Sequence, residues 1–130
     1  MPLQLWENRK EKKLDPALFS SKAEEFAQKI SHEAKGTTNK GTQLRKFFDE
    51  ILRLDTLAQN GNADWNILLP QVHMLVAKAA YAQGRKLVSE SFVRHIREGV
   101  NQIEDKADLH VFSSHMEAFM GFYKLHNEEN

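Results

Sequence analysis

The clearest heptad-like pattern in the chain lies in residues 105–124, which read DKADLHVFSSHMEAFMGFYK. Its apolar side chains recur every three or four residues, at Leu109, Phe112, Met116, Phe119, Met120 and Tyr123. This spacing places them on one face of an α-helix. We therefore predict a helix that begins after Asp105 and packs this face against other helices. The same face could instead join neighbouring copies of the chain, although packing within one chain is the commoner use of such a pattern.

Similar spacing upstream predicts further helices. The first begins at Asp15-Pro16, where an N-cap residue is followed by proline at the first helical position. Gly36 follows it as a left-handed stop. The second carries its apolar face from Leu44 to Ala58 and ends before the turn residues 60–62. The fourth begins at the cap Ser89.

The third helix is harder to place, because Pro70 lies inside the apolar run from Trp65 to Gln83. A proline in a helix interior removes a hydrogen bond and clashes with the preceding turn. We therefore predict that this helix begins near Leu69 and ends at Gly84, with residues 65–68 in a separate turn.

No stretch alternates with the period of two that marks strands. The sequence thus predicts an all-α, single-domain bundle of about five helices over residues 15–126. We expect residues 1–14 to form a flexible N-terminal tail and residues 127–130 to form a frayed C-terminus.

The composition is that of a soluble globular protein, with 130 residues, 41% hydrophobic and 28% charged. The absence of cysteine excludes disulfides, thiolate nucleophiles and cysteine-based metal sites. No apolar run approaches the ~20 residues of a membrane span. These features predict a cytoplasmic protein that does not contact membranes.

The sequence lacks the common catalytic and metal-binding patterns. No two histidines have the i,i+4 spacing of a shared metal, no Glu-x-x-His motif occurs, and no serine lies in a Gly-x-Ser-x-Gly elbow. The loop from Gly36 to Gly41 lacks the lysine that a P-loop requires. We predict neither an enzyme nor a cofactor or metal site.

Local charge gives the best indication of function. The formal net charge is zero, yet the stretch from residue 35 to 46 holds four cations and no Asp or Glu: Lys35, Lys40, Arg45 and Lys46. They surround a predicted helix N-terminus, whose free N–H groups favour phosphate. A structural alternative is that Arg45 and Lys46 form i,i+4 pairs with Asp49 and Glu50.

A second cluster consists of Lys78, Arg85 and Lys86. Lys78 lies near the end of the predicted third helix, and Arg85 and Lys86 follow it. Arg85 and Lys86 could simply offset the partial negative charge of its last carbonyls. If the second and third helices pack antiparallel, both clusters could line one groove. Net neutrality argues mildly against a free-standing nucleic-acid-binding protein. It does not argue against a subunit that shares its ligand with partners.

Two segments carry a family resemblance: Thr42-Gln43-Leu44-Arg45-Lys46-Phe47-Phe48-Asp49-Glu50-Ile51, and Ala77-Lys78-Ala79-Ala80-Tyr81-Ala82-Gln83-Gly84-Arg85. With Leu69-Pro70 between them and the aromatic segment Met116 to Lys124 after them, they resemble the small helical subunit of the type III-A CRISPR effector, the Csm complex. Position 48 is Phe where that family often has Tyr.

The resemblance implies a non-catalytic subunit that stacks in several copies along the guide RNA–target RNA duplex during antiviral defence. Its partners would be both RNA strands, the other subunits of the complex and neighbouring copies. It would contact the phosphate backbone and leave sequence recognition to base pairing. The implied RNA-binding residues are Lys40, Arg45, Lys46, Lys78, Arg85 and Lys86, with Lys35 a weaker member. The alternative function is a self-associating helical scaffold that joins copies through residues 112–123 without touching RNA.

Overall fold

The computed structural model describes residues 2–127 of the chain. They form one short 3-10 helix and five α-helices: η1 (Pro16–Phe19), α1 (Ser21–His32), α2 (Gly41–Gln59), α3 (Trp65–Gly84), α4 (Glu90–Asn101) and α5 (Lys106–His126). The described residues contain no strand, which confirms the predicted all-α single domain. None of these helices is long and apolar enough to span a membrane.

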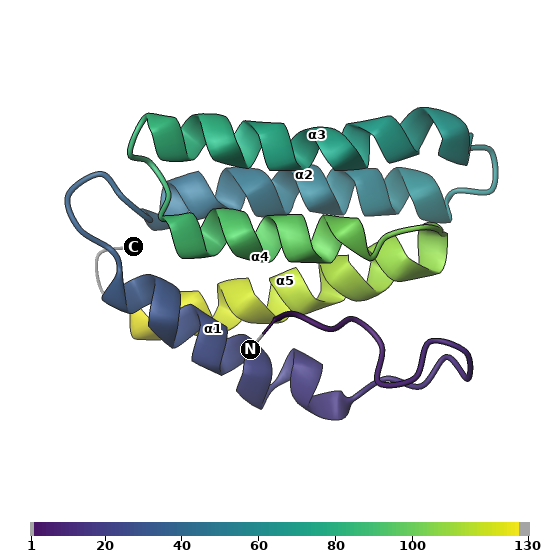
Figure 1. Ribbon diagram of the computed structural model, residues 1–130, viewed down its shortest axis with the longest axis horizontal. Helices are drawn as coiled ribbons and strands as arrows, with labels where there is room; N and C mark the ends of the chain where they lie inside the picture. The colour runs from purple at the N-terminus through teal and green to yellow at the C-terminus, as the bar shows by residue number, and fades with distance from the viewer. Residues whose placement is uncertain (1, 128–130) are drawn as a thin grey trace.

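Helix α5 forms the centre of the bundle and packs mainly against α1 and α2, while α3 lies at the outer edge against α2 and α4 (Figure 1). Asp105 and Asp108 close its N-terminus with a reciprocal capping box. Five of the six predicted apolar side chains are buried, since Leu109, Phe112, Met116, Phe119 and Tyr123 are all 0% exposed, and Met120 is partly buried. The prediction that this face packs within the chain is therefore confirmed.

The N-terminal residues differ from the expected flexible tail. Residues 2–14, here called the N-terminal strap, run along the bundle, with Leu5 0% and Trp6 8% exposed. Gln102, which follows α4, accepts from the Leu5 amide at 2.9 Å, and Asp108 accepts from Trp6 Nε1 at 2.8 Å. These bonds join the strap to single side chains far along the sequence. No local sequence pattern therefore marks the strap as ordered.

Helix α3 begins at Trp65 rather than near Leu69, so the predicted separate turn is wrong. The Asp64 side chain caps the first turn, and Trp65 Nε1 donates to the Glu104 carbonyl at 3.0 Å. Leu68 is only 4% exposed, so this first turn packs into the core. Capping and burial here outweigh the single hydrogen bond that Pro70 removes.

The ends of α1 show smaller differences. The predicted first helix is divided at Ser20, whose φ of −136° and ψ of −100° separate η1 from α1. Gly36 has the predicted left-handed conformation, with φ of +60°, in the turn after α1. At the other end of the chain, residues 128–130 of the expected frayed C-terminus lie outside the described residues. Asn127 is described, and it is buried against the bundle.

Candidate functional site

Asn39 joins the two predicted basic turns at one end of the bundle. Its amide donates to the Leu87 carbonyl at 2.9 Å, and its side chain accepts from the Ser89 amide and donates to the Ser89 hydroxyl, both at 2.9 Å. The Tyr123 hydroxyl donates to the Asn39 carbonyl. Asn39 is fully buried with φ of +62°, a conformation that asparagine tolerates better than most residues.

A second set of bonds ties the same two turns together. The hydroxyls of Thr37 and Thr38 both donate to the Lys86 carbonyl, at 3.0 and 2.9 Å. Lys86 itself has φ of +62°. The turn between α1 and α2 therefore lies beside the turn between α3 and α4, as Figure 1 shows. The sequence alone leaves this placement open.

We call the resulting cationic surface the basic end. It consists of exposed cations on the two joined turns and on the first turns of α2: Lys35, Lys40, Arg45, Lys46, Arg85 and Lys86. The predicted cation Lys78 lies about two turns before the end of α3 and pairs with Glu50 of α2 at 3.6 Å. The structure thus brings six of the seven predicted cations to one end and places the seventh farther along the bundle.

The cations of the basic end are not neutralised within the chain. Among residues 2–127, none of these six cations forms an ion pair. Arg85 lies over the Tyr81 ring, 5.9 Å from its centroid. The alternative of i,i+4 pairs from Arg45 and Lys46 is therefore wrong. Glu50 instead binds Arg53 at 2.9 Å, and this bond holds the pKa of Glu50 below its ordinary value despite partial burial.

The backbone adds to the positive potential at this end. Lys40 is the N-cap of α2, makes no side-chain cap, and no acidic residue follows in the first turn. The partial positive charge of the helix N-terminus therefore has no carboxylate beside it. Chemically, the basic end offers side-chain cations and backbone donors, which suit phosphate oxygens.

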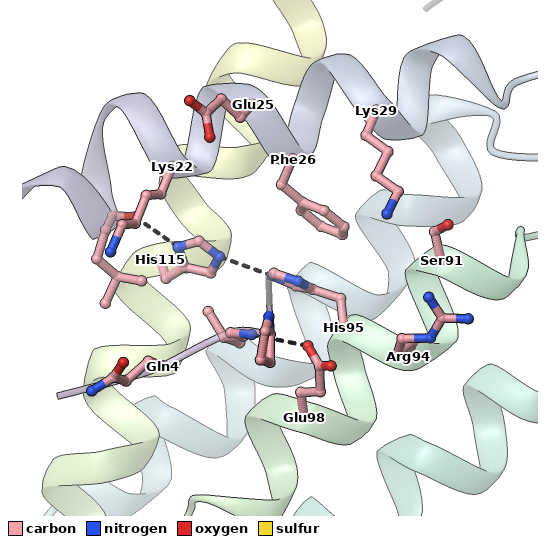
Figure 2. A pocket seen from close by; sticks show the side chains of 13 residues that line it. Gln4, Lys22, Glu25, Phe26, Lys29, Ser91, Arg94, His95, Glu98 and His115 are labelled. Carbon is pink, nitrogen blue, oxygen red and sulfur yellow. Dashed lines mark hydrogen bonds between the residues drawn. The ribbon is translucent and has the colours of Figure 1, made fainter. Parts of the chain in front are cut away.

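A cavity of about 570 Å³ lies at the other candidate site, between the strap, α1 and α4. Figure 2 shows His95 and His115 in contact there, with the Phe26 ring beside them. The two Nε2 atoms are 2.9 Å apart, and His115 Nδ1 lies 2.7 Å from the Leu18 carbonyl. His115 must donate from Nδ1 to that carbonyl, so its Nε2 accepts from His95.

Both histidines are held in the neutral form. Burial lowers the pKa of His95 well below 6.5, helped by the neighbouring His115 and Lys29. Burial also lowers the pKa of His115 and outweighs its bond to Leu18. Phe26 stacks on His95 with ring centroids 3.5 Å apart. No group of three His, Asp or Glu side chains in the described residues could hold a metal ion. The pair accordingly joins α4, α5 and η1 as a structural contact.

The comparison with protein families covers nearly all of this structure. A family model described as Csm2 Type III-A matches residues 13–129. The chain belongs to the Csm2 Type III-A family. It is thus a small subunit of a type III-A CRISPR complex, from a family of non-catalytic structural subunits, and the family resemblance is confirmed. No curated protein and no solved structure gives a significant match.

Three features of the structure were not predicted from the sequence: the docked strap, the role of Asn39 and the His95–His115 pair. The match begins at residue 13, so most of the strap precedes it. Asn39 and the His95–His115 pair act through contacts between residues tens of positions apart, with no local motif to mark them. The one sequence signal at Asn39 is its place between the basic residues of a turn, since asparagine favours left-handed backbone.

Proposed function

We propose that this subunit binds the phosphate backbone of the guide RNA–target RNA duplex through the basic end, within the cytoplasmic effector complex. Several copies would line the duplex side by side during antiviral defence. The observation that carries the proposal is the contact between two turns whose cations form no ion pairs, next to a helix N-terminus that has no side-chain cap. Lys78 is a weaker candidate, because Glu50 already neutralises part of its charge.

A chain with zero net charge suits this role. Each copy needs only a few phosphate contacts, and the rest of its surface must lie beside neighbouring subunits without repulsion. Backbone contacts carry no sequence information, which base pairing already supplies. The expected signature is a strong salt dependence, because each neutralised phosphate releases counterions.

The test compares target-RNA binding by reconstituted complexes as a function of salt. One complex carries Lys40→Glu, Arg45→Glu and Lys46→Glu. The matched control carries Lys10→Glu, Lys12→Glu and Arg97→Glu, which make the same change in net charge at exposed cations outside the basic end. Equal incorporation of each subunit is confirmed first.

We expect the basic-end variant to bind at least about tenfold more weakly at low salt. Its plot of log affinity against log salt should be shallower by roughly 0.7–0.9 for each phosphate that the variant no longer neutralises. The control should behave like the wild type. Equal losses in both variants would show a general charge effect, and no loss in either would remove RNA binding from the basic end.

The rival scaffold function uses the apolar face of α5. That face is buried in the chain's own core, where Phe112, Met116 and Phe119 are 0% exposed. This packing argues against an interface between copies through these three side chains. We expect self-association to use another surface.

A further inference from the structure

Helix α3 carries a second apolar stripe that faces solvent. The stripe, here called the α3 seam, recurs at intervals of three and four residues and consists of exposed side chains: Ile67, Pro70, Met74, Ala77 and Tyr81. Ile67 is 63%, Met74 52% and Tyr81 68% exposed. Intervals of three and four in alternation are those of a coiled-coil seam.

The packing of the bundle itself does not explain these residues. The core face of α3 is a different stripe, with Leu68, Val72, Leu75, Ala79 and Ala82 buried. Between Trp65 and Gly84 the helix contains no Asp or Glu. A helix that stays in water normally presents charged residues on its outer face. Helix α3 lies at the outer edge of the bundle (Figure 1), and all five side chains of the seam are exposed.

The charges beside the seam indicate its occupant. A row at seven-residue spacing flanks it on the α2 side and reads Asp64, Gln71, Lys78 and Arg85. In an antiparallel pair of α3 helices, equivalent flanking positions meet. Asp64 then lies opposite the partner's Arg85, and Gln71 lies opposite the partner's Lys78. The charges of this row are complementary to those of an identical row only when the two helices run antiparallel.

The α2 side chains next to this row repeat the complementarity. Arg53 donates to Gln71 at 3.0 Å, and Glu50 pairs with Lys78 at 3.6 Å. Reversal brings Arg53 toward the partner's Glu50. A parallel pair would instead place Lys78 beside the partner's His73 and leave Asp64 and Arg85 at opposite ends.

We infer that two copies of the chain pair through the α3 seam as an antiparallel, two-fold dimer. This goes beyond the proposed function, because a two-fold contact closes on itself and requires no RNA. A seam on one helix of 20 residues is only about 30 Å long. It buries less than the ~800 Å² per partner of a standard interface, so we expect a reversible dimer with a dissociation constant of about 10–100 μM.

The test is sedimentation velocity of the free full-length chain, without RNA, from about 5 to 500 μM. The wild type should shift from monomer to dimer across this range. Met74→Glu places a charge at the centre of the seam, and it should raise the dissociation constant at least tenfold. Leu125→Glu, at a side chain that is 69% exposed on α5, is the control and should leave association unchanged. Far-UV circular dichroism confirms that each variant is folded.

A charge exchange tests the antiparallel register. Arg85→Asp places two acids opposite each other and should weaken the dimer. Adding Asp64→Asn removes one of the two facing acids and keeps a side-chain oxygen that can cap α3, as Asp64 does. This double variant should associate more strongly than Arg85→Asp alone. A wild type that stays monomeric to 500 μM, or forms larger species only, would overturn the inference. So would normal association of Met74→Glu, or a double variant that associates no better than Arg85→Asp alone. The RNA test uses residues outside the seam, so either proposal can fail alone.

Discussion

Asp108 is the side chain whose removal tests whether the strap is docked in solution. It is 1% exposed and accepts hydrogen bonds from Trp6 Nε1 at 2.8 Å, from Arg9 Nη1 at 2.8 Å and from the Glu104 amide at 2.8 Å. Burial by itself would raise the pKa of Asp108. The bonds from Glu104, Arg9 and Trp6 outweigh burial and lower it below its ordinary value. The carboxylate therefore connects the strap to the start of α5.

We expect Asp108→Ala to lower the free energy of unfolding at pH 7 by about 4 kcal/mol. A hydrogen bond to a charged group contributes about 1.5–3 kcal/mol, and breaking a buried ion pair costs about 3–5 kcal/mol. Arg9 is 43% exposed, so solvent screening reduces its share and favours the middle of this range. The substitution also leaves the buried Trp6 indole N–H without its acceptor.

Urea denaturation followed by circular dichroism measures this loss. Asp49→Ala, at an exposed carboxylate, is the matched control and should change stability by less than about 0.5 kcal/mol. Because the pKa of Asp108 is lowered by folding, its contribution is present above the unfolded value of about 3.9 and disappears as pH falls through the folded value. A loss of less than about 1 kcal/mol at pH 7 would show that the strap is not held by Asp108.

Two buried histidines, a close-packed glycine and a buried asparagine are further sites whose effect on stability can be measured. Burial lowers the pKa of His95 and of His115. Their contribution to stability is therefore present above about pH 6.5, and the free energy of unfolding should fall by up to about 1.4 kcal/mol per histidine for each pH unit below it. Equal urea midpoints at pH 7.5 and 5.5 would contradict this. Gly99→Ala places a Cβ 2.3 Å from a phenylalanine ring of α5 and should cost about 1–3 kcal/mol, whereas Gly121→Ala, in open space, should be neutral or stabilising by thermal denaturation. Asn39→Ala loses several buried hydrogen bonds in left-handed backbone and should lower the free energy of unfolding by about 2–4 kcal/mol. The two basic turns should then be cleaved faster by proteases. Unchanged proteolysis would contradict the prediction.

The elements that sequence predicts well are those whose pattern is local. Helix α5 follows from its apolar spacing and from Asp105, and both the N-cap and the buried face are confirmed. Ser89 is correctly predicted as the residue before α4. Its hydroxyl accepts from Asn39 instead of capping the helix. The position of a cap is a local property, whereas the partner of its side chain depends on the whole fold.

The misplaced elements depend on distant contacts. The strap is held by side chains about a hundred positions away, such as Gln102 and Asp108. The first turn of α3 is stabilised by Asp64 and by the Trp65 bond to Glu104, which local proline rules do not include. At the candidate site, the cations could be identified from sequence. Their meeting at one end could not, because it requires the two turns that Asn39 joins.

The zero net charge and the small basic end bear on how RNA binding would be observed. A few phosphate contacts supply little affinity at physiological salt, because counterion release scales with the number of contacts. In the proposed arrangement, copies that lie side by side on one duplex would bind as a multivalent array, in which each later contact is effectively intramolecular. A free chain that binds RNA poorly is therefore consistent with a strong contribution in the assembled complex. The reverse result, tight binding by the free chain with a shallow salt slope, would require contacts other than cations to phosphate and would point away from the basic end.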